Sequence, residues 1–191
     1  MDIRIFSKEY VENDKSDVSD RYLLSILSTV ETPLDKNVKQ RYKRAYSLVF
    51  DDMKYDPNRY DDMKEYHGLE VFNESHINGC YSLIRIIKGD GIDIKDAKLD
   101  IHCGAGISRS PAVAIGFALM LDNKPLLHNI LKNNSLIKPN PRILSMFYSE
   151  TNPRECCDMW EIVSWYRYKY HNYKLSDVSP DTILKEVNLQ W

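Results

Sequence analysis

This chain of 191 residues lacks the features of several large protein classes. It contains only 7 glycines and no repeat or low-complexity tract, which argues against flexible linkers. No apolar run approaches the roughly 18 residues of a membrane-spanning helix. The opening residues MDIRIFSKEY have no apolar core of the kind found in signal peptides. We therefore expect an ordered intracellular protein without a membrane partner.

Cysteine is also scarce, with 4 in the chain. They are Cys80, Cys103, Cys156 and Cys157. The adjacent pair does not have the spacing of metal ligands, and four cysteines in a chain of this length do not make a disulfide framework. The cysteine content therefore favours the reducing environment of the cytoplasm.

A large excess of charge of one sign is missing as well. The formal net charge is -2, so charge alone favours neither a nucleic-acid partner nor an anionic membrane. Apolar residues make up 43% of the chain and charged residues 28%, as in ordinary soluble globular proteins. The length fits a single domain, since domains commonly contain about 100–200 residues.

Apolar segments of strand length alternate with helical patterns along the chain. Strands are predicted at 3–6, 22–30, 46–50 and 97–102. Helices are predicted at 77–87, 111–121, 126–135 and 142–151, the first with Asn73 as its N-cap and Gly89 and Gly91 at its end. This alternation predicts a single-domain α/β fold with a central, mainly parallel sheet flanked by helices. Such sheets bind ligands beyond the carboxyl ends of their strands.

The expected domain covers residues 1–153 and contains an irregular insertion at about 54–71. The insertion could form a lid or a wall for the substrate. Residues 154–191 are rich in aromatic side chains, and we expect a helical extension that packs on the domain or on a partner chain.

One segment carries the clearest chemical signal. His102-Cys103 ends a predicted strand, Gly104 to Ser108 form a small-residue loop, and Arg109-Ser110 begin a helix. Small residues allow such a loop to curl until its N–H groups point inward, and a nest of this kind at a helix N-terminus binds anions. Phosphate is the anion that fits best.

Within that nest, a cysteine and an arginine would have complementary roles. The N–H groups, the helix dipole and Arg109 would all favour the thiolate of Cys103, which could then attack phosphorus directly. The planar guanidinium of Arg109 could hold two phosphate oxygens and stabilise the transition state. The sequence therefore predicts a phosphatase with a cysteine nucleophile.

The segment HCGAGISRS resembles the His-Cys-five residues-Arg-Ser signature of the protein tyrosine and dual-specificity phosphatase superfamily. It is most similar to the small dual-specificity-like members of bacteria, phages and viruses, over residues of about 20–150. The resemblance implies a thiophosphate intermediate on Cys103, no metal and no cofactor. It also implies that Ser110 stabilises the departing thiolate and that His102 orders the loop. The implied phosphate-binding residues are Gly104, Ala105, Gly106, Ile107, Ser108 and Arg109.

The leaving oxygen needs a proton, so an acid must lie above the nest. Members of this superfamily use an aspartate on a loop after a neighbouring strand. Phe50-Asp51-Asp52 follows the predicted strand 46–50, and we favour Asp52 because related proteins with a Phe-x-Asp sequence use the second position. The main alternative is Asp51. Three aspartates of the insertion remain open: Asp56, Asp61 and Asp62.

We expect a phosphorylated protein as the substrate, with phosphotyrosine or phosphoserine/threonine as the group removed. A phosphoinositide phosphatase is less favoured because residues 104–108 contain no lysine. An RNA 5′-triphosphatase is less favoured because such enzymes usually have Thr-Gly after the arginine, where this chain has Ser110-Pro111. A catalytically silent phosphate-binding module is a third alternative. The basic segment 36–44 is either a solvated helix face or a rim that attracts anions.

Overall fold

The computed structural model of the protein describes residues 1–53 and 68–151. Several sequence predictions fall outside the described residues. These are the aspartates Asp56, Asp61 and Asp62, the cysteines Cys156 and Cys157, most of the predicted insertion and the predicted extension 154–191.

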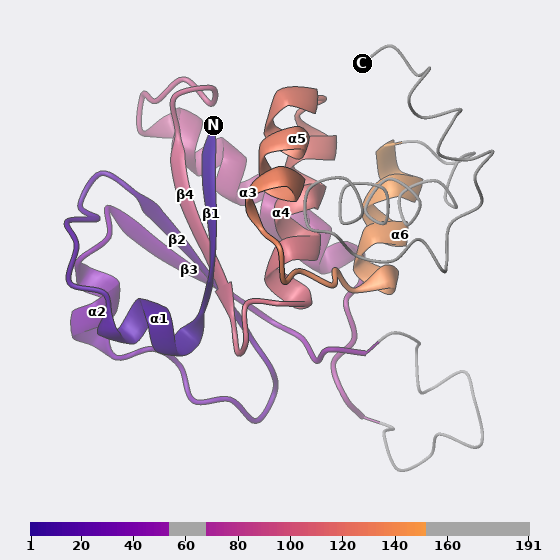
Figure 1. Cartoon of the computed structure of the whole chain (residues 1–191), viewed down its shortest axis with the longest axis horizontal. Helices are drawn as coiled ribbons and strands as arrows, with labels where there is room; N and C mark the ends of the chain where they lie inside the picture. Colours follow the sequence, from indigo (N-terminus) through magenta and orange to yellow (C-terminus); the bar gives the residue numbers. More distant parts are fainter. Residues whose placement is uncertain (54–67, 152–191) are drawn as a thin grey trace.

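Four strands form the central sheet (Figure 1). They are β1 (Asp2–Ser7), β2 (Tyr22–Leu27), β3 (Arg44–Val49) and β4 (Lys98–Cys103), in the order β1-β4-β2-β3. All neighbouring strands are parallel, so their carboxyl ends meet at one edge of the sheet. The predicted α/β fold with a parallel sheet is confirmed.

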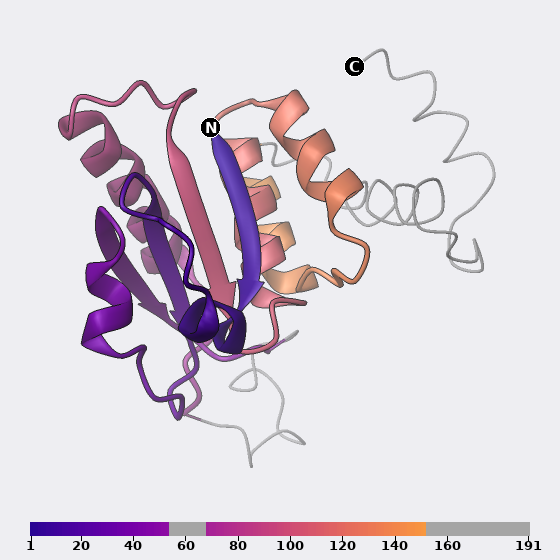
Figure 2. The same ribbon diagram turned by 60° about the vertical axis from the view of Figure 1, so that its left-hand side comes forward.

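Helices cover both faces of the sheet, and the burial of β2 shows why. Tyr22, Leu24 and Ile26 enter the larger core, whereas Leu23 enters a smaller core on the other face. A strand buried on both faces reads as a nearly continuous apolar run, as Tyr22–Leu27 does with Ser25 as its one polar residue. The larger core is covered by α3 (Glu74–Gly89), α4 (Arg109–Met120), α5 (Lys124–Asn133) and α6 (Pro141–Thr151). The smaller core is covered by α1 (Lys8–Asn13) and α2 (Lys36–Gln40), on the opposite side from α4, α5 and α6 (Figure 2).

Strand β2 ends earlier than predicted, at Leu27 instead of Val30. The carboxylate of Glu31 accepts a hydrogen bond from the N–H of Ser28 at 3.0 Å, and the N–H of Glu31 donates to the carbonyl of Ser28 at 3.2 Å. These two bonds close a turn directly after the strand, although the β-branched Thr29 and Val30 favour a strand. The turn leaves Val30 exposed and brings Glu31 to the carboxyl edge of the sheet.

The helix caps agree with the sequence. Asn73 accepts a hydrogen bond from the N–H of Ser75 and forms the predicted N-cap of α3. Helix α3 ends at Gly89, and Gly91 adopts a φ of 76°. Helix α4 is buried on all sides, as its uniformly apolar sequence predicts. None of the helices within residues 1–53 and 68–151 is long and apolar enough to cross a membrane.

The basic segment 36–44 lies largely at the wrong edge of the sheet to attract a substrate to Cys103. The N–H of Lys43 donates to the carbonyl of Arg21, beside the amino end of β2. Arg44 is the first residue of β3 and forms an ion pair with Asp90. Helix α2 has no buried residue, which fits the interpretation as a solvated helix face.

Candidate active site

Cys103 is the last residue of β4, and a loop of five residues leads from it to α4. Gly106, in the middle of this loop, has a φ of 74°. A Cβ atom at this position would lie only 2.7 Å from the backbone of Phe6. The loop is therefore pressed against β1, and only glycine satisfies both the backbone angle and the close approach.

The carbonyl groups of the loop are bonded to the surrounding protein. Gly104 accepts from the N–H of Lys8 at 3.0 Å, and Ile107 accepts from the N–H of Lys138 at 2.8 Å. By contrast, no N–H group of residues 104–108 donates a hydrogen bond to any residue that the structure describes. Amides left free in this way at the start of a helix are suited to binding an anion.

Cys103 lies beside a hydroxyl group at the base of the loop. Its side chain is buried, and its Sγ is 3.2 Å from Oγ of Ser110 in the first turn of α4. A hydroxyl at this distance can donate a hydrogen bond to a thiolate. The structure thus brings the two residues into the contact that the sequence motif implied.

Arg109 is held in place by two of its three guanidinium nitrogens. Nη1 donates to the carbonyl of Phe50 at 3.1 Å, and Nη2 donates to Oε1 of Glu31 at 2.8 Å. The third nitrogen, Nε, is buried and has no hydrogen-bond partner among the described residues. The bonds of Nη1 and Nη2 therefore fix the guanidinium beside the loop, at the start of α4.

Glu31 is a site residue that the sequence analysis did not identify. Burial raises the pKa of its carboxyl group, but hydrogen bonds from Arg109 and from the N–H of Ser28 outweigh this effect and lower the pKa overall. The carboxylate is therefore negative at neutral pH and fixes the guanidinium. Its place in the segment after β2 was the only sequence signal that could have revealed it.

His102 is neutral at pH 7 and belongs to the scaffold of the site. Its ring is fully buried, and Nε2 lies 2.8 Å from Oγ of Ser25 on β2. Burial lowers the pKa of His102 to about 4 and outweighs the nearby Cys103 backbone, which favours the protonated ring. The Nδ1 atom has no hydrogen-bond partner among the described residues. The side chain links β4 to β2 directly behind the loop.

The two favoured aspartates have different surroundings. Asp52 is exposed, and its Oδ1 accepts hydrogen bonds from Oγ of Ser108 at 2.8 Å and from Nδ2 of Asn140 at 2.7 Å. Asp51 is buried and accepts from the N–H and hydroxyl of Thr29 and from the N–H of Glu70. The carboxylate of Asp52 therefore lies at the loop, whereas that of Asp51 joins two chain segments.

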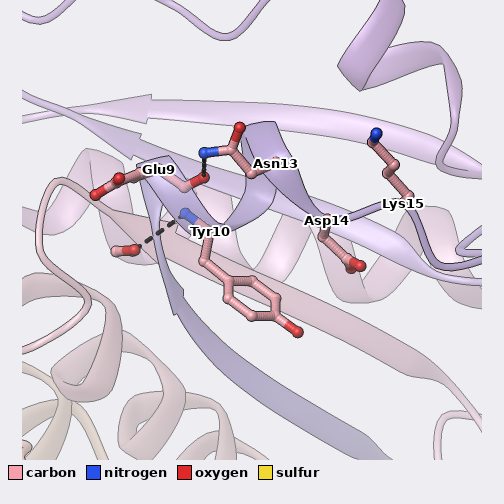
Figure 3. A pocket seen from close by; sticks show the side chains of 6 residues that line it. Glu9, Tyr10, Asn13, Asp14 and Lys15 are labelled. Atoms are coloured by element: carbon pink, nitrogen blue, oxygen red, sulfur yellow. Dashed lines mark hydrogen bonds between the residues drawn. The ribbon is translucent and has the colours of Figure 1, made fainter.

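A pocket of about 580 Å³ lies beside this site, on α1. Its lining residues are Ser7, Glu9, Tyr10, Asn13, Asp14 and Lys15. It includes neither Cys103 nor Arg109, and its side chains point in different directions without converging on one point (Figure 3). Because it also mixes acidic and basic groups, the pocket is not a second anion site.

Comparisons with known proteins support the architecture. No protein-family model and no curated protein sequence matches the chain. Among solved structures, PTPMT1 in complex with PI(5)P matches with a TM-score of 0.52 and 16% identity, over 80% of this chain and 94% of that chain. Tk-PTP in its active form matches with a TM-score of 0.48 and 12% identity, over 81% and 93% of the two chains.

The chain shares the fold of PTPMT1. At 16% identity, the match to PTPMT1 supports this architecture and not a particular substrate. In this fold, four of the predicted site residues gather around one loop: Cys103, Arg109, Ser110 and Asp52. His102 lies directly behind that loop. No group of three or more His, Cys, Asp or Glu side chains in the described part of the chain could hold a metal ion.

Proposed function

We propose that this protein hydrolyses phosphomonoesters through a covalent intermediate on Cys103. The observation that carries the proposal is the arrangement around the loop. The Sγ of Cys103 lies 3.2 Å from Oγ of Ser110, and the guanidinium of Arg109 is fixed beside the loop by Phe50 and Glu31. Together with the free amides of residues 104–108, this guanidinium provides donors for the oxygens of a phosphoryl group.

The reaction proceeds in two steps. The Sγ of Cys103 attacks phosphorus, an S–P bond forms, and the bond from phosphorus to the ester oxygen breaks. Asp52 gives its proton to the departing oxygen. A water molecule then attacks the thiophosphate and transfers a proton to Asp52, while the hydroxyl of Ser110 stabilises the departing thiolate. Inorganic phosphate is released, and both Cys103 and Asp52 return to their starting states.

A phosphotyrosine-containing protein is the substrate that the surface favours. The large apolar side chains that are exposed in the described residues are Tyr10, Val30, Val49, Ile107 and Leu136. The first four lie at or shortly after the carboxyl ends of the strands, and the fifth lies near Lys138, which is bonded to the loop at Ile107. Exposed apolar side chains at this edge of the sheet, near an uncharged loop, suit an aromatic ring and its apolar neighbours.

A phosphoinositide is the second candidate substrate. PTPMT1, which resembles this chain in fold, forms a complex with PI(5)P. Against this candidate, residues 104–108 contain no basic side chain that could bind an additional phosphate of an inositol ring.

One set of assays separates these functions. Phosphate release should be measured from a phosphotyrosine peptide, a phosphoserine peptide and PI(5)P vesicles, with the wild type and Cys103→Ser. We expect the wild type to hydrolyse the phosphotyrosine peptide fastest. Cys103→Ser should lose this activity but still bind the peptide, because an alcohol in the nest remains protonated.

Three outcomes would change the assignment. Near wild-type activity of Cys103→Ser would refute the mechanism. Faster hydrolysis of PI(5)P would select the second candidate. Binding of the peptide by the wild type without any turnover would identify a silent phosphate-binding module.

A further inference from the structure

We infer that Asn140 is the positioning residue for the general acid, and that Asp52 transfers its proton through Oδ2. This inference rests on the proposed function, because it assigns how the acid of that same reaction is held. It depends on a contact between the segment before α6 and the loop before α4, which are far apart in sequence.

The side-chain amide of Asn140 can have only one orientation. Its Oδ1 accepts hydrogen bonds from the N–H groups of Arg142 at 3.0 Å and Ile143 at 3.2 Å, in the first turn of α6. With the oxygen committed to these two donors, the Nδ2 group must point the other way. It donates to Oδ1 of Asp52 at 2.7 Å and to the carbonyl of Met53 at 3.3 Å.

The segment that carries Asn140 is also fixed to the phosphate loop. The N–H of Asn140 donates to the carbonyl of Ser108 at 3.2 Å, and the N–H of Lys138 donates to the carbonyl of Ile107 at 2.8 Å. Asn140 is itself almost completely buried. The amide that holds Asp52 is therefore rigid with respect to the loop on which the reaction takes place.

Both hydrogen bonds to the acid end on the same oxygen. Ser108 Oγ and Asn140 Nδ2 donate to Oδ1 of Asp52, and no described residue donates to Oδ2. In a protonated carboxyl group, the carbonyl oxygen accepts hydrogen bonds and the other oxygen carries the proton. Two donors on Oδ1 therefore fix it as the carbonyl oxygen and leave the proton on Oδ2.

A purely structural role for Asn140, as the cap of α6, must be separated from this positioning role. Asn140→Asp keeps an oxygen acceptor for the N–H groups of Arg142 and Ile143, but it places an acceptor where Nδ2 donated to Asp52. Asn123→Ala is the matched control, because Asn123 caps the neighbouring helix α5 through the N–H of Leu126 and has no hydrogen bond to Asp52.

The test compares an aryl phosphate with a poor leaving group, phenyl phosphate, and one with a good leaving group, 4-nitrophenyl phosphate. General acid catalysis contributes about 10²–10⁴-fold, and its loss slows the first step only for the ester that needs the proton. Because both esters share the second step, the first step is followed through kcat/KM. For Asn140→Asp, kcat/KM on phenyl phosphate should fall at least about tenfold more than kcat/KM on 4-nitrophenyl phosphate. Asn123→Ala should change both substrates equally.

A double-mutant cycle with Asp52→Asn completes the test. If Asn140 acts through Asp52, Asn140→Asp should cause no further leaving-group dependence when Asp52 is already Asn. Equal slowing of both esters by Asn140→Asp, or full additivity in the cycle, would overturn the inference and leave Asn140 as a helix cap.

If the proposed function itself were wrong, the wild type would hydrolyse neither ester. The contact between Asn140 and Asp52 could still be tested in that case. The side-chain amide resonance of Asn140 in an NMR spectrum should shift in Asp52→Asn and stay unchanged in Asn123→Ala. An unchanged resonance in Asp52→Asn would contradict the contact.

Discussion

Asp51 and Asp52 are chemically identical neighbours, yet their carboxylates contact different parts of the molecule. The carboxylate of Asp51 is buried and accepts hydrogen bonds from Thr29 and Glu70. The carboxylate of Asp52 is exposed and lies against Ser108 of the loop. The N–H of Met53 donates to the carbonyl of Asp51 at 2.9 Å, so a tight turn centred on Asp52 separates the two carboxylates and directs only that of Asp52 to the loop.

Replacing each carboxylate by the amide should therefore have a different effect, on activity for Asp52 and on stability for Asp51. Asp52→Asn should retain the stability of the wild type and slow phosphotyrosine much more than an activated aryl phosphate. Asp51→Asn should lower the free energy of unfolding by about 1–3 kcal/mol, because it weakens a buried acceptor of three donors. Urea denaturation and the two kinetic assays measure these effects. The reverse pattern would show that Asp51 is the acid.

His102 gives the protein a pH dependence of stability. Its pKa is lowered from an ordinary 6.5 to about 4 by burial, so the unfolded chain binds a proton between these values and the folded chain does not. The stability due to the neutral ring is complete above pH 6.5 and is lost as the pH falls toward 4. The loss is at most about 3 kcal/mol.

Unfolding free energies from pH 7 to 4 check this effect. We expect the stability of His102→Gln to fall less steeply between pH 6.5 and 4 than that of the wild type. Parallel curves for the two proteins would show that His102 has the same affinity for protons in the folded and unfolded chains.

At the scale of elements, the phosphate loop depends on the strand beside it. Gly106 has a positive φ, and a Cβ atom added at this position would lie 2.7 Å from the backbone of Phe6. Gly106→Ala should therefore distort the loop and lower kcat/KM by about 10²-fold or more, since misplacing reacting groups by 1 Å has an effect of this size.

Gly89 offers the matched control for this loop substitution. It is the last residue of α3, its φ is not positive, and an added Cβ would meet nothing within 4 Å. Gly89→Ala should leave the kinetics unchanged. Full activity of Gly106→Ala would contradict the geometry of the loop.

A buried ion cluster joins β1, β4 and the segment directly before β2. Asp100 on β4 is fully buried and is bonded to Arg4 on β1 at 2.6 Å and to Arg21, directly before β2, at 2.6 Å. Removing the carboxylate would take the partner from Arg4 and leave the buried Arg21 paired with Asp2 alone among the described carboxylates. Breaking a buried pair in this way commonly costs about 3–5 kcal/mol.

Asp100→Ala should therefore lower the free energy of unfolding by about 3–5 kcal/mol in urea denaturation. Asp93 is the control, because it forms an exposed ion pair with Lys95 on the surface. Asp93→Ala should change stability by less than about 1 kcal/mol. A similar small effect for both variants would show that the buried cluster does not stabilise the sheet.

For the molecule as a whole, local patterns in the sequence predicted the order of strands and helices along the chain. The spacing of apolar residues and the local composition were enough to predict the buried strand β2, the N-cap at Asn73 and the fully buried helix α4. The motif from His102 to Ser110 predicted the central loop, because all its residues are adjacent in sequence.

The remaining site residues depend on contacts between distant segments. Glu31 reaches Arg109 only because a turn ends β2 early, and Asn140 reaches Asp52 only because α6 starts beside the loop. The choice between Asp51 and Asp52 also needed the backbone direction after β3. No periodicity or motif encodes these contacts, so the sequence left them undecided or undetected.

The central claim is that the phosphoryl group is transferred to Cys103. The direct measurement is rapid chemical quenching of wild type and Asp52→Asn during hydrolysis of 4-nitrophenyl phosphate, followed by proteolysis and mass spectrometry. We predict phosphate on the peptide that contains Cys103, with more of it in Asp52→Asn because the second step needs the base. The peptide with Cys80, whose pKa burial raises to about 12, should remain unmodified. Phosphate on any other residue, or turnover without protein-bound phosphate in either protein, would contradict the account.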